Sequence, residues 1–322
     1  MIEPLFLDGV LQEKIWGGNK LKKEFGYNSP SDRTGELWAI SAHKNGPATV
    51  STGPYAQKTL TELWDDHREL FGHQEGDVFP LLTKIIDATD DLSVQVHPDD
   101  TYGLEHEGEL GKTECWYIID AEKDAEIIFG HHAQTKDDFV SMIENGQWDK
   151  LLRYVKVKPG DFFYVPSGTI HAIGSGIMIL ETQQSSDTTY RVYDYDRKDN
   201  NGNTRPLHIQ QSIDVTTIPH SDPEPSKVTT EIEKSTITTL VSNDFFTVQE
   251  WSISGQTPFM AEGVYTLVSV LDGNGKLDIK GSSYSLTKGM HFILPSGITS
   301  WTIDGELHII ASVPGVKSDT TS

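Results

Sequence analysis

Two histidines, a glutamate and a glutamine in this chain have types and spacings that suit metal chemistry. The stretch LSVQVHPDD places Gln95 and His97 two residues apart, so their side chains point to one face of a strand. The stretch GKTECWYII contributes Glu114, and VPSGTIHAI contributes His171. Such a mixed nitrogen and oxygen set suits zinc, and manganese, iron and cobalt accept it too. A single histidine is more often a hydrogen-bonded structural residue, so the prediction depends on the four residues meeting on facing strands.

The histidine of the third stretch ends a phrase that the chain uses twice. GDFFYVPSGTIH and GMHFILPSGITS share the pattern Gly-x5-Pro-Ser-Gly, but the first copy ends in His171 and the second in Ser300. Glycine lets the chain turn into a strand, and the Pro-x-Gly bend after it aims the next side chain inward. The first copy resembles the second sequence motif of the cupin β-barrels. Glycine and proline punctuation is common in β proteins, but agreement of the whole phrase predicts two barrels, only the first with a metal site.

The elements that must position these residues are predicted to be mostly strands. Residues 79–97 contain two apolar runs broken at 87–91, residues 112–130 resemble a hairpin, and the sequence after 230 alternates short strands with glycine turns, including DGNG at 272–275. A short amphipathic helix is expected at 58–72, with Thr59 or Thr61 as its cap and Gly72 at its end. Further helices are expected near 135–152 and 206–215.

The predicted organisation is two domains. Residues 1–220 would form a cupin domain with the metal site and a short helical insert near 135–152. Residues 221–230 lie in a segment rich in proline and poor in apolar residues, which is typical of a linker. Residues 231–322 would form a degenerate cupin barrel without a metal site. The expected fold class is therefore mainly β, with two cupin-type antiparallel β-barrels of the jelly-roll kind and short helical insertions.

Composition restricts the partners of the protein. The 322 residues carry a net charge of −22, and the isoelectric point is about 4.8, which argues against nucleic acid and anionic membranes as partners. There is no apolar run long enough for a transmembrane helix, and Glu3 lies where a signal peptide needs positive charge. Cys115 is the only cysteine, which excludes an internal disulfide and favours the cytoplasm. An anionic substrate would need a local basic cluster.

Four ordered motifs make a closer resemblance than the cupin pattern alone. LSVQVHPDD, GKTECWY, VPSGTIHAI and ILETQQSSDTTYRVYDYDR together resemble the type I mannose-6-phosphate isomerases in their short bacterial form, and KIWGG and GELWAIS near the N-terminus fit as well. The resemblance covers almost the whole chain and is most specific over residues 10–215. It implies an isomerase that interconverts mannose 6-phosphate and fructose 6-phosphate. It also implies one zinc ion per chain, with other divalent metals possible, held by Gln95, His97, Glu114 and His171.

The resemblance also assigns catalytic residues. It implies that Arg191 is catalytic, that Lys112 binds substrate and that Glu181 holds an acidic position in the active site. An aldose–ketose interconversion through a cis-enediol develops negative charge on oxygen, which a divalent metal and an arginine can stabilise. Glu181 is the candidate base, with Lys112 as its rival. The alternative is that Glu181 only pairs with Arg191 to fix its position.

The phosphate of such a substrate needs cations and hydrogen-bond donors. The predicted phosphate-binding residues are Ser93, Lys84, Lys112 and Arg197. Lys84 could instead extend along apolar surface to a sheet edge, and Arg197 could instead pair with Asp194 or Asp196. The predicted partner is thus a phosphorylated hexose, bound by a cytoplasmic monomer or weak homo-oligomer.

Two other classes of protein share part of this pattern. A cupin metal oxygenase also uses histidines and a glutamate, but it needs a redox-active metal and no phosphate-binding residues. A non-catalytic sugar-binding cupin would keep a polar cavity and could lack Arg191 and Glu181. The basic residues favour the isomerase over both.

Overall fold

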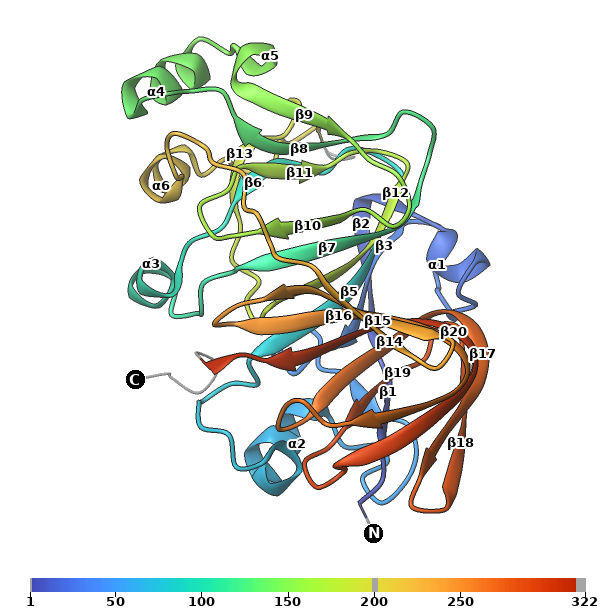
Figure 1. The fold of residues 1–322 in the computed structure, drawn as a ribbon. Helices are drawn as coiled ribbons and strands as arrows, with labels where there is room; N and C mark the ends of the chain where they lie inside the picture. Colours follow the sequence, from blue (N-terminus) through green and yellow to red (C-terminus); the bar gives the residue numbers. More distant parts are fainter. Residues whose placement is uncertain (1, 199–201, 317–322) are drawn as a thin grey trace.

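A computed structural model describes residues 2–198 and 202–316, in which antiparallel strands predominate (Figure 1). The predicted mainly β class is therefore confirmed. None of the helices in these residues is long and apolar enough to cross a membrane.

Two sheets face one another in the first part of the chain. The six-stranded sheet has the order β10 (Phe162–Val165), β7 (Glu114–Ala121), β12 (Ile177–Gln184), β5 (Leu81–Ala88), β2 (Val10–Gly18) and β3 (Thr34–Ile40). Strand β3 also pairs directly with β5. The five-stranded sheet has the order β13 (Tyr190–Tyr193), β6 (Val94–Val96), β11 (His171–Ile173), β8 (Glu126–His131) and β9 (Leu152–Lys156). Apolar side chains such as Ile118 and Ile179 from the first sheet and Ile127 and Ile173 from the second pack in one buried cluster. We call this pair of sheets the N-terminal sandwich.

The third sheet contains nine strands and is called the C-terminal sheet. Its order is β14 (Val228–Ile232), β15 (Ser235–Ser242), β16 (Phe246–Met260), β20 (Ser300–Pro314), β17 (Thr266–Ile279), β19 (His291–Leu294), β1 (Leu5–Asp8) and β4 (Thr49–Val50), with β18 (Ser282–Thr287) paired to β17. All three strand orders are open rather than closed, so the predicted pair of barrels is not confirmed.

The helices are short and lie outside the sheets. They are α1 (Lys20–Lys23), α2 (Leu60–Asp66), the 3-10 helix η1 (Arg68–Phe71), α3 (Asp100–His106), α4 (Lys136–Glu144), α5 (Trp148–Leu151) and α6 (Ile209–Val215). Thr59 caps α2 in a capping box with Glu62, and Gly72 follows η1 in the left-handed conformation, as predicted. Helices α4, α5 and α6 cover the outer face of the five-stranded sheet, where Val94 and Val96 pack against them.

Two local predictions are wrong. Strands β7 and β8 follow one another in sequence but lie in different sheets, so residues 112–130 cross the N-terminal sandwich instead of forming a hairpin. The DGNG residues lie inside β17, where they pair in register with β20 directly after a register shift between Val270 and Asp272, and the turn to β18 comes later, at Lys280 and Gly281. In both places the strand pairs with a strand that is distant in sequence, and such a partner cannot be read from the local sequence.

The repeated phrase has the same backbone shape in both copies. Gly160 and Gly289 have φ of +88° and +87°, and Gly168 and Gly297 have φ of +82° and +90°. These left-handed values favour glycine, so the pattern in the sequence corresponds to a repeated bend in the fold.

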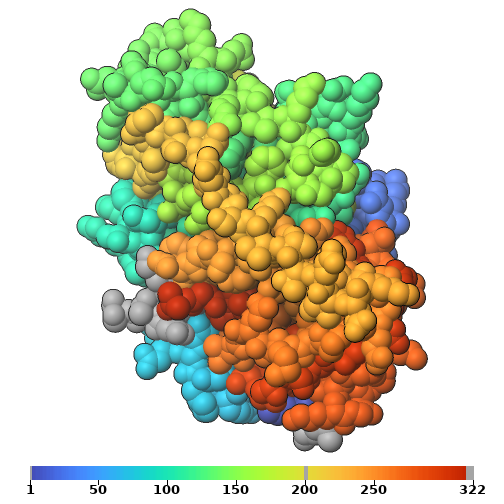
Figure 2. Space-filling view, viewed as in Figure 1, coloured from blue at the N-terminus to red at the C-terminus, as the bar shows by residue number. Residues whose placement is uncertain are grey.

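The two parts of the molecule share strands and core. Strand β1 pairs with β19, so residues near the N-terminus complete the C-terminal sheet. Strand β14 begins at Val228, inside the predicted linker range, and the space-filling view shows the chain after α6 crossing the surface between the two parts (Figure 2). The division at residues 221–230 stays a prediction.

Candidate active site

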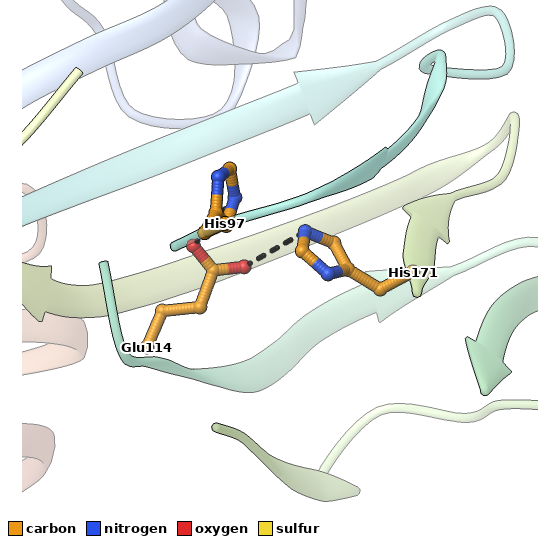
Figure 3. A group of neighbouring side chains, drawn as sticks. All are labelled: His97, Glu114 and His171. Atoms are coloured by element: carbon orange, nitrogen blue, oxygen red, sulfur yellow. Dashed lines mark ion pairs between the residues drawn. The ribbon is translucent and has the colours of Figure 1, made fainter. Parts of the chain in front are cut away.

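Three predicted ligands meet between the sheets of the N-terminal sandwich (Figure 3). His97 directly follows β6, His171 is the first residue of β11, and Glu114 is the first residue of β7 in the opposite sheet. His97 Nε2 lies 3.4 Å from Glu114 Oε2, and His171 Nε2 lies 3.3 Å from Glu114 Oε1. All three side chains are buried. The structure therefore brings three of the four predicted ligands together.

The hydrogen bonds behind the histidines decide which nitrogen is available. His97 Nδ1 donates to the carbonyl oxygen of Thr188 and His171 Nδ1 donates to that of Thr169, each at 2.9 Å. Burial lowers the pKa of both imidazoles, that of His171 to about 3, so both are neutral. A neutral imidazole that donates through Nδ1 keeps a lone pair on Nε2, and here both lone pairs point at Glu114.

The charge state of Glu114 follows from the same surroundings. Burial, together with the nearby negative charge of Glu181, raises the pKa of Glu114 to about 8. His97 Nε2 and both carboxylate oxygens of Glu114 are buried without a hydrogen-bond partner. A buried group of two imidazole nitrogens and one carboxyl group this close together is suited to a divalent cation, which would displace the proton of Glu114. The residues present therefore fit a bound divalent metal.

Gln95 lies beside this group, but its amide presents nitrogen rather than oxygen to His171. It pairs in register with His171 on one side and with Arg191 on the other. Gln95 Nε2 lies 3.4 Å from His171 Nε2, so the amide presents its nitrogen, and a half-turn of the amide would present its oxygen. Ligation by Gln95 stays a prediction.

A cavity of about 320 Å³ lies next to the metal-ligand group. Its lining includes five cationic side chains and three carboxylates: Lys14, Lys84, Lys112, Arg191 and Arg205 with Glu36, Glu181 and Asp187. This local excess of positive charge contrasts with the net charge of −22 of the whole chain. The cavity therefore supplies the basic cluster that an anionic substrate needs.

One row of side chains crosses the six-stranded sheet beneath this cavity. In register, Trp38 on β3 faces Lys84 on β5, which faces Glu181 on β12, which faces Trp116 on β7. Lys84 Nζ lies 3.6 Å from Glu181 Oε1, and Trp116 Nε1 donates to Glu181 Oε2 at 3.0 Å. Burial opposes charge on Lys84, but attraction to Glu36 and Glu181 outweighs it and raises its pKa. Glu181 is thus paired with Lys84 and Trp116, which differs from the alternative of a pair with Arg191.

Arg191 reaches the cavity from β13. Its Nη1 donates to the carbonyl oxygen of Pro206 at 2.8 Å, while its Nε is buried without a partner. Burial and the positive charge of Arg205 lower the pKa of Arg191, although an arginine stays protonated at any physiological pH. A guanidinium with an unpartnered Nε at the cavity wall is placed to meet a negative ligand.

The predicted phosphate-binding residues separate into two groups. Ser93, Lys84 and Lys112 line the cavity. Arg197 is not among the lining residues, and its guanidinium instead contacts Asp194 at 2.5 Å and the carbonyl oxygen of Asp91. The ion pair with Asp194 is the alternative that the sequence left open, and the phosphate role of Arg197 stays a prediction.

Several lining residues were not predicted from the sequence. Lys14, Trp16 and Glu36 belong to the KIWGG and GELWAIS motifs, so a signal for them existed in the resemblance. Asp187 and Thr189 lie in a loop within the motif ILETQQSSDTTYRVYDYDR, whereas Arg205 lies in a loop outside every motif. Only the fold brings them to the cavity.

Comparisons with known proteins agree along the whole chain. A family model described as phosphomannose isomerase type I, catalytic domain, matches residues 5–131, and one described as mannose-6-phosphate isomerase, cupin domain, matches residues 236–314. A Streptococcus mutans protein named mannose-6-phosphate isomerase is 59% identical over 97% of this chain and 98% of its own length. Mannose-6-phosphate isomerase ManA of Bacillus subtilis is 55% identical over 96% of this chain and 98% of its own length.

Solved structures give the same result. The crystal structure of the mannose 6-phosphate isomerase from Bacillus subtilis matches with a TM-score of 0.94 and 52% identity, covering 97% of this chain and 100% of that one. A putative mannosephosphate isomerase from Archaeoglobus fulgidus matches with a TM-score of 0.77 over 98% of this chain and 100% of that one. At 21% identity, the second match supports the fold alone.

Proposed function

The chain belongs to the type I phosphomannose isomerase family, as its motifs predicted, and we propose on this premise that it interconverts mannose 6-phosphate and fructose 6-phosphate. The observation that carries the proposal is the buried group of His97, Glu114 and His171 beside a cavity with five cationic side chains. A metal site alone would suit many reactions, and a basic pocket alone would suit many anions. Their combination suits a phosphorylated sugar whose oxygens must be polarised.

We infer that His97, Glu114 and His171 hold one divalent metal, with zinc as the proposed ion and Gln95 as a fourth ligand. The support is the set of unsatisfied donor atoms and the backbone carbonyls that orient both imidazoles. When bound, such a metal supplies a Lewis acid that stabilises negative charge on the sugar oxygens. Two neutral nitrogens and one carboxylate form a set that zinc accepts readily.

Proton transfer between the two sugar carbons is assigned to Glu181. Its Oε2 is fixed by Trp116, while its Oε1 is buried without a hydrogen-bond partner and lies at the cavity. A carboxylate with one oxygen fixed by a hydrogen bond, and the other held only by the ion pair with Lys84, is well placed to take a proton from carbon and return it. The rival, Lys112, lies 3.6 Å from Glu114 Oε2, so part of its role is to compensate that carboxylate.

Arg191 is assigned to the negative charge of the cis-enediol intermediate. It pairs in register with Gln95, so it lies next to the metal-ligand group, and its Nε has no partner among the described residues. A guanidinium that is already desolvated and in place costs no reorganisation when charge develops. Ser93, Lys84 and Lys112 are assigned to substrate binding at the cavity wall.

The two competing classes fit the site less well. A metal oxygenase has no use for five cations around its cavity, and a sugar-binding protein has no use for a Glu181 whose one oxygen is left unsatisfied. The test is to incubate metal-loaded, untagged protein with mannose 6-phosphate under anaerobic conditions and to measure fructose 6-phosphate. Product formation without oxygen supports the isomerase, and failure to form product with stoichiometric metal bound would contradict it.

We further propose that the protein acts in the cytoplasm as a monomer or weak homo-oligomer, with Cys115 buried and unpaired.

A further inference from the structure

The cavity has two ends, which are defined by strands β6 and β13. Ser93, Gln95 and His97 alternate along one face of β6, so His97 marks the metal end and Ser93 the opposite end. Arg191 pairs in register with Gln95, and Tyr193 pairs with Val94. Asp194, which follows Tyr193, therefore lies at the Ser93 end of the cavity.

The cations around the cavity differ in how many carboxylates lie close enough to neutralise them. Lys84 lies close to Glu181 and is also attracted by Glu36, and Lys112 lies beside Glu114. At the Ser93 end, a single buried carboxylate, Asp194, binds two guanidiniums, and the cavity-lining Arg191 adds a third cation nearby. This end therefore keeps an excess of positive charge, which matches a phosphate dianion.

Arg205 and Arg197 use Asp194 in different ways. Arg205 donates to it through Nε at 2.7 Å and Nη2 at 2.6 Å, so the guanidinium is held by one edge, while its Nη1 amino group has no partner among the described residues. Arg197 divides its two amino groups between Asp194 and the carbonyl oxygen of Asp91. Arg205 lines the cavity and Arg197 does not.

We propose that Arg205, oriented by Asp194, binds the phosphate of the substrate together with Ser93, and that Arg197 is a positioning residue behind it. This inference rests on the proposed function, because it takes the substrate to be a phosphorylated hexose. Bidentate contact with Asp194 fixes the plane of the Arg205 guanidinium before the ligand arrives, so little further ordering is needed. The sugar would then extend from Ser93 and Arg205 toward Gln95 and the metal end.

The test compares Arg205→Gln with Arg197→Gln and with the matched control Lys198→Gln. Lys198 is exposed and bridges to Thr204, so its substitution removes one positive charge from the same loop without reaching the cavity. For each protein, inorganic phosphate is titrated as a competitive inhibitor of mannose 6-phosphate turnover and as a ligand in calorimetry. Arg205→Gln should raise both KM and the phosphate inhibition constant about tenfold to a hundredfold, with kcat within about twofold. The control should change both constants less than about twofold.

Two further results keep the outcome decisive. Arg205→Lys should restore part of the phosphate affinity, since the charge returns without the planar guanidinium, and it serves if the glutamine variant does not fold. Unchanged phosphate affinity in Arg205→Gln or Arg205→Lys, or a larger loss in Arg197→Gln, would overturn the assignment. Calorimetry keeps this test separate from the proposed function: absence of turnover in the wild-type protein would reject the isomerase, whereas phosphate binding would still report on Arg205.

Discussion

The N-terminal sandwich and the C-terminal sheet contain the same bend and put it to different uses. In the first copy the bend leads to His171, which is buried in the metal-ligand group, and in the second it leads to Ser300, which is exposed. Around the second bend, Val268, Val270, Phe292 and Leu294 are packed in one buried apolar cluster. The bend is thus a structural feature of both copies, and whether a metal-ligand site forms depends on the side chain that follows it.

Buried histidines in the two regions differ in their hydrogen-bond partners. His291 is buried in the C-terminal sheet, and its two nitrogens contact Ser269 Oγ at 2.9 Å and the Tyr27 hydroxyl at 2.8 Å. His97 is equally buried, but its Nε2 has no hydrogen-bond partner. Burial lowers the pKa of both, so charge does not distinguish them. The two histidines differ in their partners: His97 Nε2 faces Glu114 in the metal-ligand group, whereas both nitrogens of His291 are held in structural contacts.

The two regions also support one another. A single apolar cluster combines Leu81, Tyr117 and Leu180 of the N-terminal sandwich with Val248 and Ile310 of the C-terminal sheet. At its edge, the Tyr117 hydroxyl donates to Glu250 at 2.7 Å, and His308 also contacts this carboxylate, at 2.8 Å. Tyr117 lies next to Trp116, which holds Glu181. The C-terminal sheet therefore covers the back of strands that carry the active site.

The largest expected effect comes from removing the C-terminal region. Deletion of residues 231–322 takes away β19, the partner of β1, and exposes the apolar face around Leu180. An exposed apolar face of this kind promotes aggregation, so we expect insoluble protein, measured as the soluble fraction after expression. A truncated protein that is soluble, metal-loaded and fully active would show that the two regions are independent.

The next effect is the loss of a metal ligand. His171→Ala removes one nitrogen from the buried group, so we expect loss of bound metal and of measurable turnover, while the sandwich cores keep the fold. His97→Ala and Glu114→Ala should behave in the same way. Elemental analysis and circular dichroism are the measurements. Near-stoichiometric metal in the His171→Ala protein would remove this residue from the ligand set.

A smaller but still large effect is expected at Arg191. Arg191→Ala should lower kcat about a hundredfold or more and change KM less, because its charge is used in the transition state. Arg191→Lys should recover only part of the rate, since the planar donors are lost. Steady-state kinetics on mannose 6-phosphate decide the matter. A kcat near that of the wild type in Arg191→Ala would exclude Arg191 from the chemistry.

Metal binding should release a proton whose source is Glu114. Because burial and Glu181 raise its pKa to about 8, from an ordinary 4.5, the metal-free protein holds this carboxyl mostly protonated at pH 7. The histidines have lowered pKa values and are already neutral, so they release none. We expect close to one proton per metal at pH 7 and few at pH 9, measured by calorimetry in buffers of different ionisation enthalpy.

The same shift has a consequence for stability with a definite sign. A carboxyl group whose pKa is raised on folding stabilises the metal-free protein below its unfolded value, and this contribution is lost as the pH rises from about 4.5 to about 8. Thermal unfolding of metal-free protein should therefore show a stability that falls over this range. Proton release close to zero already at pH 7, or a stability that does not fall between pH 4.5 and 8, would mean that Glu114 is ionised in the metal-free protein.

The sequence predicted the ligand group better than the surroundings of the group. Period-two alternation predicted the face of each side chain within its strand, and the family resemblance predicted that His97, Glu114 and His171 lie together, as they do in the structure. Strand partners were not predictable in the same way, and the crossing between β7 and β8 follows from burial against distant strands. Arg205 was missed because its role depends on Asp194 and on a cavity wall that only the folded chain creates.

The smallest expected effect is at the second copy of the bend. Ser300 is exposed, pairs in register with Met260 and belongs to no metal-ligand group among the described residues, so Ser300→Ala removes only an exposed hydroxyl. Activity, metal content and stability should stay within experimental error, with a change in unfolding free energy below about 0.5 kcal/mol. The informative partner is Ser300→His, which restores the motif of the first copy. It should bind no metal, because the neighbouring inward side chains Val268, Phe292 and Leu294 are apolar and offer no other ligand. Stoichiometric metal in Ser300→His beyond that of the wild type would show that the bend alone can create a site, and the contrast between the two regions would then rest on one residue.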